Sequence, residues 1–555
     1  MRGGLGGRLL ARAAGVVARS RRFITESSGG TSLILGVMAF GGAAGMSLAL
    51  GPPPPRVHDE FSYLLAGDTF ALGRVANPTH AMWTHFETFH VLQTPSYASK
   101  YPPAPGLFLA IGQVLTGSPI VGVWLSLGLA AAAIGWMLRG WFSPGWAFLG
   151  AILAQRPYLV VGWGDSYWGG GVPLLGGALV LGAVPRLFAE PRPVHGLALV
   201  GGLLVLASSR PYEGLLASMV PTGAVLLRLW RGRRDRTVTA RCLLVVPSML
   251  LLGIGGAALA YYNARVTGSP WQVPYAAYEA QYSYVPVFGW EELGTPPAYR
   301  HEIFRRYYRE YGEHTFSQTS VVSTRWRFKQ TLESHVWRWY LGSALTLPVI
   351  VSMWRPRGDA LVGLLVCALV VVGNLAAAWV WPHYFAPAAP ALYLLVTLGL
   401  RKLSMLAFRR VRVGVALVVL LVGGAMWEAA GQYPLLLRAA RSNRVSWAQS
   451  RVRLEAELAR EPELDLVLVR YARHHNVHDE WVYNRAAIDA APVVWAREMD
   501  EASNHRLLEY FRDRKAWLLL ADERPVRLVA HESPGSRAAL PRTPRAAGSG
   551  KDDRR

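Results

Sequence analysis

The chain has 555 residues, of which 52% are hydrophobic and 17% are charged, whereas soluble domains carry about 25% charged residues. The apolar residues fall into blocks of about 17 to 23, the length that crosses a hydrocarbon core of about 30 Å. Only two cysteines occur, Cys242 and Cys367, both in predicted spans, which argues against a disulfide framework or a cysteine-based metal site. The composition therefore predicts an α-helical integral membrane protein.

About eleven transmembrane helices are predicted. The fifth is the shortest, and its boundary with the sixth rests on the polar segment 208–211. The first span has no clear cleavage site before its proline stop, so we expect it to be retained. The predicted spans are 32–51, 119–138, 144–163, 172–189, 195–209, 212–230, 242–262, 337–353, 359–381, 384–400 and 411–429.

The net charge of +22 follows the predicted topology. Arginine is concentrated in alternate connections between spans, beginning with the N-terminal tail, and the short connections on the other side contain almost none. This alternation is the positive-inside rule, so no nucleic-acid partner is expected. It predicts a cytoplasmic N-terminus, and the odd number of spans then predicts an extracytoplasmic C-terminus. The Arg/Ala/Gly-rich composition is typical of a GC-rich bacterial genome, so we expect multi-pass insertion in the inner (plasma) membrane.

The sequence divides into a basic cytoplasmic tail (1–30), a transmembrane part (31–429), a C-terminal α/β domain (430–530) and a disordered tail (531–555). Two large outer loops, 52–118 and 263–336, interrupt the transmembrane part. In the C-terminal domain, short apolar runs predict strands at 464–469, 493–495 and 517–520, with a helix near 500–512. A short apolar stretch, 105–115, predicts an amphipathic helix along the membrane interface.

Polar motifs occur where predicted spans reach the outer side. Asp59 and Glu60 follow the first span and its proline stop, and Tyr63 lies one helical turn later. Lys100 and Tyr101 precede two prolines in the same loop. The remaining candidates are Asp165 in the second outer turn, Arg210 and Glu213 beside the sixth span, and His383 and Tyr384 at the start of the tenth.

Each candidate also has a plain structural interpretation. The carboxylates Asp59 and Glu60 could be solvated charge beside the membrane, and Asp165 could cap a helix. Lys100 could extend its ammonium toward the interface. Arg210 and Glu213 could pair between helices, and His383 and Tyr384 could be interfacial aromatics. His80, His85 and His90 are spaced by five and share no helix face, so no metal site is predicted there.

Taken together, these motifs resemble those of GT-C-type integral-membrane glycosyltransferases, in the group of protein O-mannosyltransferases and aminoarabinose transferases. The acidic pair Asp59-Glu60 occupies that family's position after the first span. The Lys100 to Pro103 segment resembles its Lys-Pro-Pro element, with an inserted tyrosine that the common pattern lacks. Asp165 matches a further acid of the family, and Tyr262-Asn263 opens the large outer loop. The resemblance covers roughly residues 30–430, so the 31–429 part is expected to be a GT-C-like catalytic domain.

The resemblance implies transfer of a sugar from a polyprenyl-phosphate carrier to a glycan, lipid or protein acceptor on the outer face. Such a displacement needs a carboxylate that accepts the acceptor's proton, which predicts Asp59 as base. Glu60 is expected to orient the loop, and Asp165 to position the acceptor or a cation. Charge grows on the departing phosphate and needs cations, which suits Lys100 and Arg210. No cofactor is assigned, and a divalent cation is left open.

Two other functions are left open. A transporter or flippase is disfavoured because the hydropathy pattern shows no internal repeat and no charge-bearing broken helix at mid-membrane. An O-antigen polymerase or ligase would use arginines of the large outer loop, where Arg300, Arg305, Arg306 and Arg309 occur. The acidic pair after the first span tells against that alternative.

Overall fold

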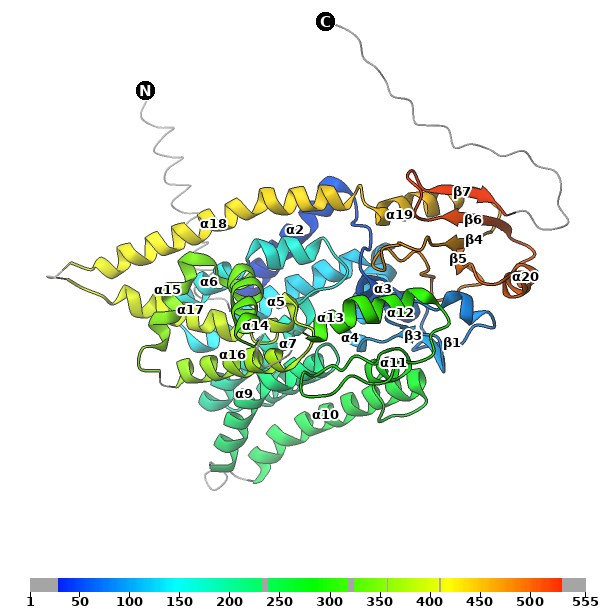
Figure 1. Cartoon of the computed structure of the whole chain (residues 1–555). Helices are drawn as coiled ribbons and strands as arrows, with labels where there is room; N and C mark the ends of the chain where they lie inside the picture. The colour runs from blue at the N-terminus through cyan, green and yellow to red at the C-terminus, as the bar shows by residue number, and fades with distance from the viewer. Residues whose placement is uncertain (1–27, 232–237, 318–323, 357, 409–410, 532–555) are drawn as a thin grey trace, which may run out of the picture.

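The strands gather at one end of a helical bundle in the computed structural model, which describes residues 28–231, 238–317, 324–356, 358–408 and 411–531 (Figure 1). Most of the predicted N-terminal basic tail and of the predicted disordered C-terminal tail lies outside these residues. Within them, six helices are long and apolar enough to cross a membrane. These are Gly29–Leu50, Ile120–Trp141, Gly171–Ala189, Val245–Thr267, Asp359–Ala376 and Val413–Asn443.

A helix lies at each of the eleven predicted spans, but five predicted spans coincide with helices outside that set of six. Some of these are short or interrupted, so the number of spans remains a prediction. The helices are α2 (Ser28–Leu50), α5 (Ile120–Trp141), α6 (Pro144–Leu153) with η2 (Tyr158–Gly162), α7 (Gly171–Ala189), α8 (Pro193–Ala207), α9 (Pro211–Arg231), α10 (Val238–Thr267), α15 (Gly342–Met353), α16 (Asp359–Ala376), α17 (Ala389–Ser404) and α18 (Val413–Asn443).

The third predicted span is broken at a charged residue. Helix α6 ends at Leu153, η2 begins at Tyr158, and Arg156 lies between them with only 2% of its surface exposed. Its Nη2 atom is 3.9 Å from Oε2 of Glu428 on α18. This charged break was not predicted, and the absence of a charge-bearing broken helix at mid-membrane stays a prediction. Hydropathy averages over such a break, because the flanking residues are apolar.

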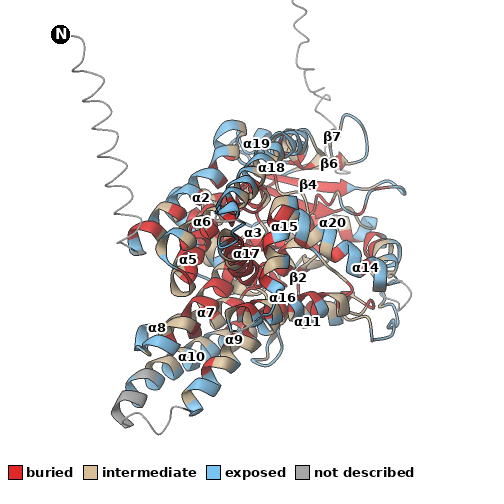
Figure 2. Cartoon of the chain, turned by 90° about the vertical axis from the view of Figure 1, so that its left-hand side faces the viewer, coloured by how far each residue is buried: buried red, intermediate tan, exposed pale blue. Residues whose placement is uncertain are grey.

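Glycines allow the helices to approach closely. A Cβ atom on Gly122 of α5 would lie 1.8 Å from the carbonyl oxygen of Phe108, on α4 (Pro103–Thr116). Small residues at helix contacts let backbones pack directly in a membrane. This close contact fixes α4 against α5. It thereby also positions the segment that precedes α4. Buried residues lie toward the bundle centre, whereas α10 presents exposed residues over much of its length (Figure 2).

The segment predicted as the first outer loop, residues 52–118, consists of helices and short strands. It begins with α3 (His58–Ala71), which packs against α4. Between the two helices, a three-stranded sheet has the order β1-β3-β2, and Val91 pairs antiparallel with Ser99. The elements are β1 (Asn77–Pro78), η1 (Trp83–Phe86), β2 (Val91–Leu92) and β3 (Ser96–Ser99). The predicted 105–115 helix is α4, which exposes Leu107, Ile111, Val114 and Leu115.

The second outer loop consists of short helices rather than strands. Tyrosine rings from this loop pack with residues of the first loop in one apolar cluster, so the two loops share a core. Its elements are α11 (Pro274–Tyr282), α12 (Glu302–Arg306), η4 (Tyr307–Gly312), α13 (Glu313–Ser317), α14 (Thr324–Gln330) and η6 (Thr331–Leu341).

The C-terminal segment contains the three predicted strands and the helix between them, together with a fourth strand that was not predicted. The sheet order is β5-β4-β6-β7, with β7 antiparallel to β6 and the other pairs parallel. Before the first of these strands, the chain leaves the end of α18 and forms α19. The elements are α19 (Trp447–Leu458), β4 (Asp465–Arg470), β5 (Val493–Arg497), α20 (Glu501–Tyr510), β6 (Lys515–Leu520) and β7 (Arg527–Ala530).

This sheet packs on the first outer loop. Leu466 and Leu468 of β4 share a buried cluster with Phe61 and Leu65 of α3. The alternate residues Val467 and Val469 face a second cluster on the other side of the sheet, as the alternation of side chains along a strand requires. The C-terminal segment therefore shares a core with the loop that carries the acidic pair, and its standing as a separate domain remains a prediction.

Candidate active site

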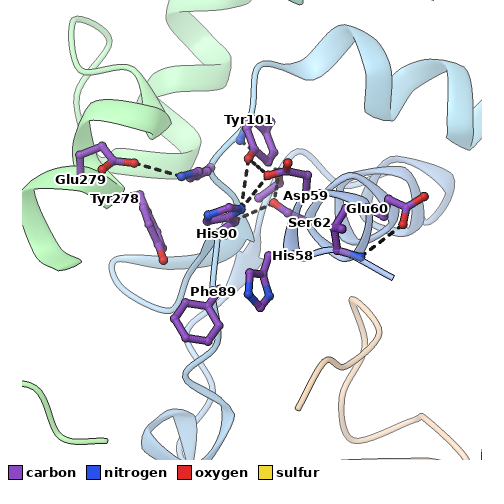
Figure 3. Close-up of polar contacts among 12 residues, drawn as sticks. His58, Asp59, Glu60, Ser62, Phe89, His90, Tyr101, Tyr278 and Glu279 are labelled. Carbon is purple, nitrogen blue, oxygen red and sulfur yellow. Dashed lines mark hydrogen bonds and ion pairs between the residues drawn. The ribbon is translucent and has the colours of Figure 1, made fainter. Parts of the chain in front are cut away.

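Asp59 lies in the first turn of α3 and is fixed through one of its two carboxylate oxygens. Its Oδ1 atom is 2.7 Å from Nδ1 of His90 and accepts a hydrogen bond from the Tyr101 hydroxyl. Within the described residues, Oδ2 has no hydrogen-bond partner, and 22% of the side chain is exposed. Figure 3 shows His90 and Tyr101 on one side of Asp59. The carboxylate is thus anchored at one oxygen and available at the other.

His90 has an unusual backbone conformation for a residue that is not glycine. Its φ angle is +61°, in the left-handed region that L-residues with a side chain seldom adopt. Its carbonyl oxygen accepts hydrogen bonds from the Ser62 hydroxyl at 2.6 Å and from the Lys100 backbone N–H at 3.2 Å. These contacts join α3 and the strand pair to His90, so the fold holds the imidazole against Asp59.

The groups around Asp59 keep it ionised. Burial alone would raise the pKa of Asp59, but the charge and hydrogen bond of His90, the hydrogen bond of Tyr101 and the charge of Lys100 hold that pKa well below its usual range. Burial and Lys100 lower the pKa of His90, so at neutral pH we take its contribution to be a hydrogen bond from a neutral ring. Burial and Asp59 raise the pKa of Tyr101, so the phenol keeps the proton that it donates.

Glu60 is directed away from Asp59 and bonds to the backbone (Figure 3). Its Oε2 atom accepts from the N–H groups of Arg56 and Val57 at 2.7 and 3.3 Å, which caps α3. Its Oε1 atom accepts from the Tyr167 N–H at 2.9 Å. The side chain is fully buried. These bonds tie the start of α3 to the second outer turn, which is the kind of contact that a loop-orienting role requires.

Lys100 is buried among tyrosine rings and paired with an acid that the sequence did not indicate. Its Nζ atom is 3.0 Å from Oε1 of Glu279 on α11. The ring centres of Tyr275 and Tyr278 are each 4.6 Å from the same nitrogen, within the range of cation–π attraction. An ammonium group has three donors, so the pair with Glu279 leaves donors free for a second anion.

Arg210 immediately precedes α9, and its guanidinium lies over an aromatic ring. Its guanidinium carbon is 4.1 Å from the ring centre of Tyr384. Tyr63 lies within electrostatic reach of Arg210, Asp59, Tyr384 and Glu213, and it stacks on Tyr101 with ring centres 4.5 Å apart. Arg210 therefore belongs to the same cluster as Asp59.

His383 and Glu213 are buried at the edge of this cluster. His383 is 4% exposed, and its ring meets those of Trp168 and Tyr384 edge to face. Burial, followed by the charge of Arg210, lowers the pKa of His383 well below its usual value. Glu213 is 6% exposed in the first turn of α9, where a carboxylate is favoured by the helix dipole.

Asp165 is bound by a residue of the C-terminal segment, Arg444. Its Oδ1 and Oδ2 atoms are 2.7 and 3.0 Å from Nη2 and Nη1 of Arg444, which follows the last residue of α18. Arg444 also donates to the carbonyl oxygen of Gly51. This bidentate pair joins the ends of α18 and α2 to the second outer turn. Asp165 is thus in a bridging position in the structure, and its predicted role in positioning an acceptor or cation stays a prediction.

The structure brings together most of the predicted residues, and adds others. The residues that sequence patterns did not indicate are His90, Glu279, Tyr275 and Arg444. In the part of the chain that the structure describes, no three His, Cys, Asp or Glu side chains are arranged to hold a metal ion. The predicted residues that gather around Asp59 are Tyr63, Lys100, Tyr101, Arg210, Glu213, His383 and Tyr384.

No family model matches the chain, and no curated protein matches it. Fourteen chains of solved structures match this chain. ArnT from Cupriavidus metallidurans bound to undecaprenyl phosphate is 14% identical, with a TM-score of 0.49 over 88% of this chain and 92% of that one. The same protein in its apo state is 13% identical, with a TM-score of 0.46 over 87% and 92% of the two chains. The Archaeoglobus fulgidus oligosaccharyltransferase in complex with zinc and sulfate is 13% identical, with a TM-score of 0.46 over 87% of this chain and 67% of that one. Both proteins are glycosyltransferases of the GT-C type to which the sequence motifs bear a resemblance.

Proposed function

We propose that this protein is a membrane glycosyltransferase that moves a sugar from a polyprenyl-phosphate carrier to an acceptor hydroxyl on the outer face of the membrane. The observation that carries the proposal is the asymmetry of the Asp59 carboxylate. Its Oδ1 atom is held by His90 and Tyr101, while its Oδ2 atom has no hydrogen-bond partner within the described residues and the side chain is 22% exposed. Two cations, Lys100 and Arg210, belong to the same cluster.

In the proposed reaction, the acceptor oxygen attacks the anomeric carbon of the sugar. The bond between that carbon and the phosphate oxygen breaks, and the polyprenyl phosphate leaves with the bonding electrons. Oδ2 of Asp59 accepts the proton of the acceptor hydroxyl. Because its pKa is depressed, the carboxylate is a weak base, so it takes the proton only as the new glycosidic bond forms and the hydroxyl becomes acidic.

Lys100 and Arg210 supply positive charge for the departing phosphate. Cations placed where negative charge grows lower the energy of the transition state. Arg210 can offer two parallel N–H donors to a phosphate, and the Tyr384 ring fixes the plane of its guanidinium. Lys100 acts as a point charge within reach of Glu279 and Asp59. The donor class follows from the motif resemblance, and undecaprenyl phosphate, the ligand of the ArnT structure, is a carrier of this class.

A transfer assay in proteoliposomes tests this proposal. The purified protein should move sugar from at least one of a panel of polyprenyl-phosphate sugars to an acceptor hydroxyl. Reporter fusions at about residues 235 and 450 should be cytoplasmic and extracytoplasmic respectively. The proposal fails if no donor of the panel is consumed, or if both reporters show the reverse orientation, because the site would then face the cytoplasm.

A transporter is the second candidate, and one observation favours it. The charged break at Arg156 opposite Glu428 is the kind of interrupted helix from which transport sites are built. Uptake of labelled carrier lipid without consumption of its sugar would support that function. The polymerase or ligase alternative is less favoured, because Arg300, Arg305 and Arg306 are each paired with a glutamate.

A further inference from the structure

The contact between His90 and Asp59 has the geometry of an orienting pair. An ionised carboxylate can only accept hydrogen bonds, so Nδ1 of His90 carries the proton and donates it across the 2.7 Å separation. This bond and the one from Tyr101 both end on Oδ1. Together they block that oxygen and restrict rotation of the carboxylate about its bond to the chain.

The backbone at His90 is shaped to place this ring. Among residues with side chains, the left-handed conformation is uncommon and occurs mostly at asparagine, aspartate and histidine, and His90 adopts it here. Strained residues of this kind are retained where the surrounding structure fixes them, and they concentrate at functional sites. The bonds from Ser62 and Lys100 to the His90 carbonyl provide that fixation.

Other titratable groups face the pair from several elements, and all of them bear on its protonation. His58 of α3 lies with its ring centre 5.6 Å from that of His90, and among the described residues its buried Nε2 atom has no hydrogen-bond partner. Glu279 forms an ion pair with Lys100. The remaining groups within electrostatic reach of Asp59 or His90 are Tyr63, Lys100, Tyr101, Tyr275, Tyr307, Tyr311, His383, Tyr384 and Tyr483. His478 lies within electrostatic reach of His58.

We infer that His90 is a positioning residue of the transfer reaction: its Nδ1–H holds Oδ1 of Asp59 so that Oδ2 receives the proton of the acceptor hydroxyl. The inference rests on the proposed function and adds a residue that no sequence motif indicates. His90 acts through Asp59, and its removal should slow the chemical step while leaving donor binding unchanged.

Two substitutions are compatible with the left-handed backbone conformation of residue 90, so they test the role of the imidazole ring without disturbing the fold. His90→Gly keeps the left-handed conformation at no steric cost but removes the donor. His90→Asn also tolerates this conformation and ends in an N–H group near the position of Nδ1. His90→Gly should lower kcat by about 10- to 100-fold, the usual effect of losing an orienting partner. Its donor KM should stay unchanged, and His90→Asn should recover part of the lost kcat.

The pH profile gives a readout that a purely structural role would not change. His90 helps to hold the pKa of Asp59 low, so in His90→Gly the loss of activity on acidification should begin at higher pH. His80→Asn is the matched control, because His80 lies in the same loop and contacts a different carboxylate, Asp489, at 2.9 Å. That control should retain the wild-type kcat and pH profile.

The outcomes separate this inference from the proposed function. Wild-type kcat and pH profile in His90→Gly would overturn the role of His90, as would a parallel loss of donor binding that His90→Asn does not restore. The proposed function is tested independently by the wild-type protein and by Asp59→Asn. If the wild type transfers sugar and Asp59→Asn does not, a normal His90→Gly enzyme contradicts only the positioning role.

Discussion

The imidazole of His58 and the phenol of Tyr483 are separated by 425 residues in the sequence, yet Nδ1 of the first lies 2.8 Å from the hydroxyl oxygen of the second. His58 opens the helix that carries Asp59. Tyr483 lies between β4 and β5 of the C-terminal sheet, and its ring stacks on Phe61 with centres 4.0 Å apart. The C-terminal segment therefore holds the first turn of α3 in place.

Removing the Tyr483 hydroxyl should destabilise the protein without touching the proposed base. In Tyr483→Phe, Nδ1 of His58 would be buried without a partner, a loss of about 1–3 kcal/mol, and thermal unfolding in detergent should occur at lower temperature. Tyr510→Phe is the control, since its hydroxyl bonds Asp489 at the surface. Equal unfolding temperatures of the two variants would contradict the proposed anchoring of α3.

The Asp165–Arg444 pair should stabilise the protein, because it joins the ends of α18 and α2 to the turn that contains Asp165. Its side chains are 8% and 11% exposed, so Asp165→Asn should cost about 3–5 kcal/mol, as expected when one partner of a buried ion pair is lost. The exposed pair Glu190–Arg192 is the control, and Glu190→Gln should change stability by less than about 1 kcal/mol. Chemical denaturation of both variants measures the difference. A small effect in Asp165→Asn, coupled with lost transfer, would instead assign Asp165 to the reaction.

Glu279 should compete with the donor phosphate for Lys100. Glu279→Gln leaves a side chain of the same shape but removes the charge that engages the ammonium at 3.0 Å, so the donor should bind more tightly. Lys100→Ala should weaken donor binding. Donor titrations of both variants, monitored by intrinsic fluorescence, provide the measurement. Donor affinity that falls in Glu279→Gln would show that the carboxylate supports binding rather than competing with it.

Sugar transfer should continue to a lower pH than it would if the base were an aspartate with an ordinary pKa. Asp59 must be ionised to accept a proton, and a depressed pKa means that ionisation is lost only as pH falls below the usual carboxylate range near 3.9. Tyr101→Phe removes one bond that favours the ionised form, so its activity should decline at higher pH than that of the wild type. Profiles of kcat/KM that extend from neutral pH to well below the usual carboxylate pKa near 3.9 test this. Coincident profiles would mean that the Tyr101 hydroxyl has no part in tuning Asp59.

Sequence patterns predicted the helical bundle, three strands of the C-terminal sheet and, among the candidate site residues, Asp59, Lys100 and Arg210. They succeeded because apolar blocks, short apolar runs and local motifs record local structure. They could not find His90, whose position depends on a register between two very short strands. Nor could they find Glu279, whose pairing with Lys100 spans 179 residues, because tertiary contacts of this kind leave no periodic signal.

The broken third span was missed for a related reason. A window averaged over 144–163 is apolar, since only Arg156 in it is charged. The cost of burying that arginine in a membrane is reduced by a partner on another helix, Glu428, which the sequence places far away. A hydropathy profile reflects the free-energy cost of placing a charged residue in a membrane, but it does not include a partner residue that offsets this cost.

The most direct measurement compares Asp59→Asn with the wild type for donor binding and for sugar transfer in the same proteoliposomes. The substitution preserves the size of the side chain, retains an oxygen for His90 and Tyr101, and removes the basic carboxylate. The account predicts that transfer falls by about 100-fold or more, the usual contribution of a general base, while the donor binds with nearly unchanged affinity. Transfer at the wild-type rate by Asp59→Asn would contradict the assignment of Asp59 as the proton acceptor.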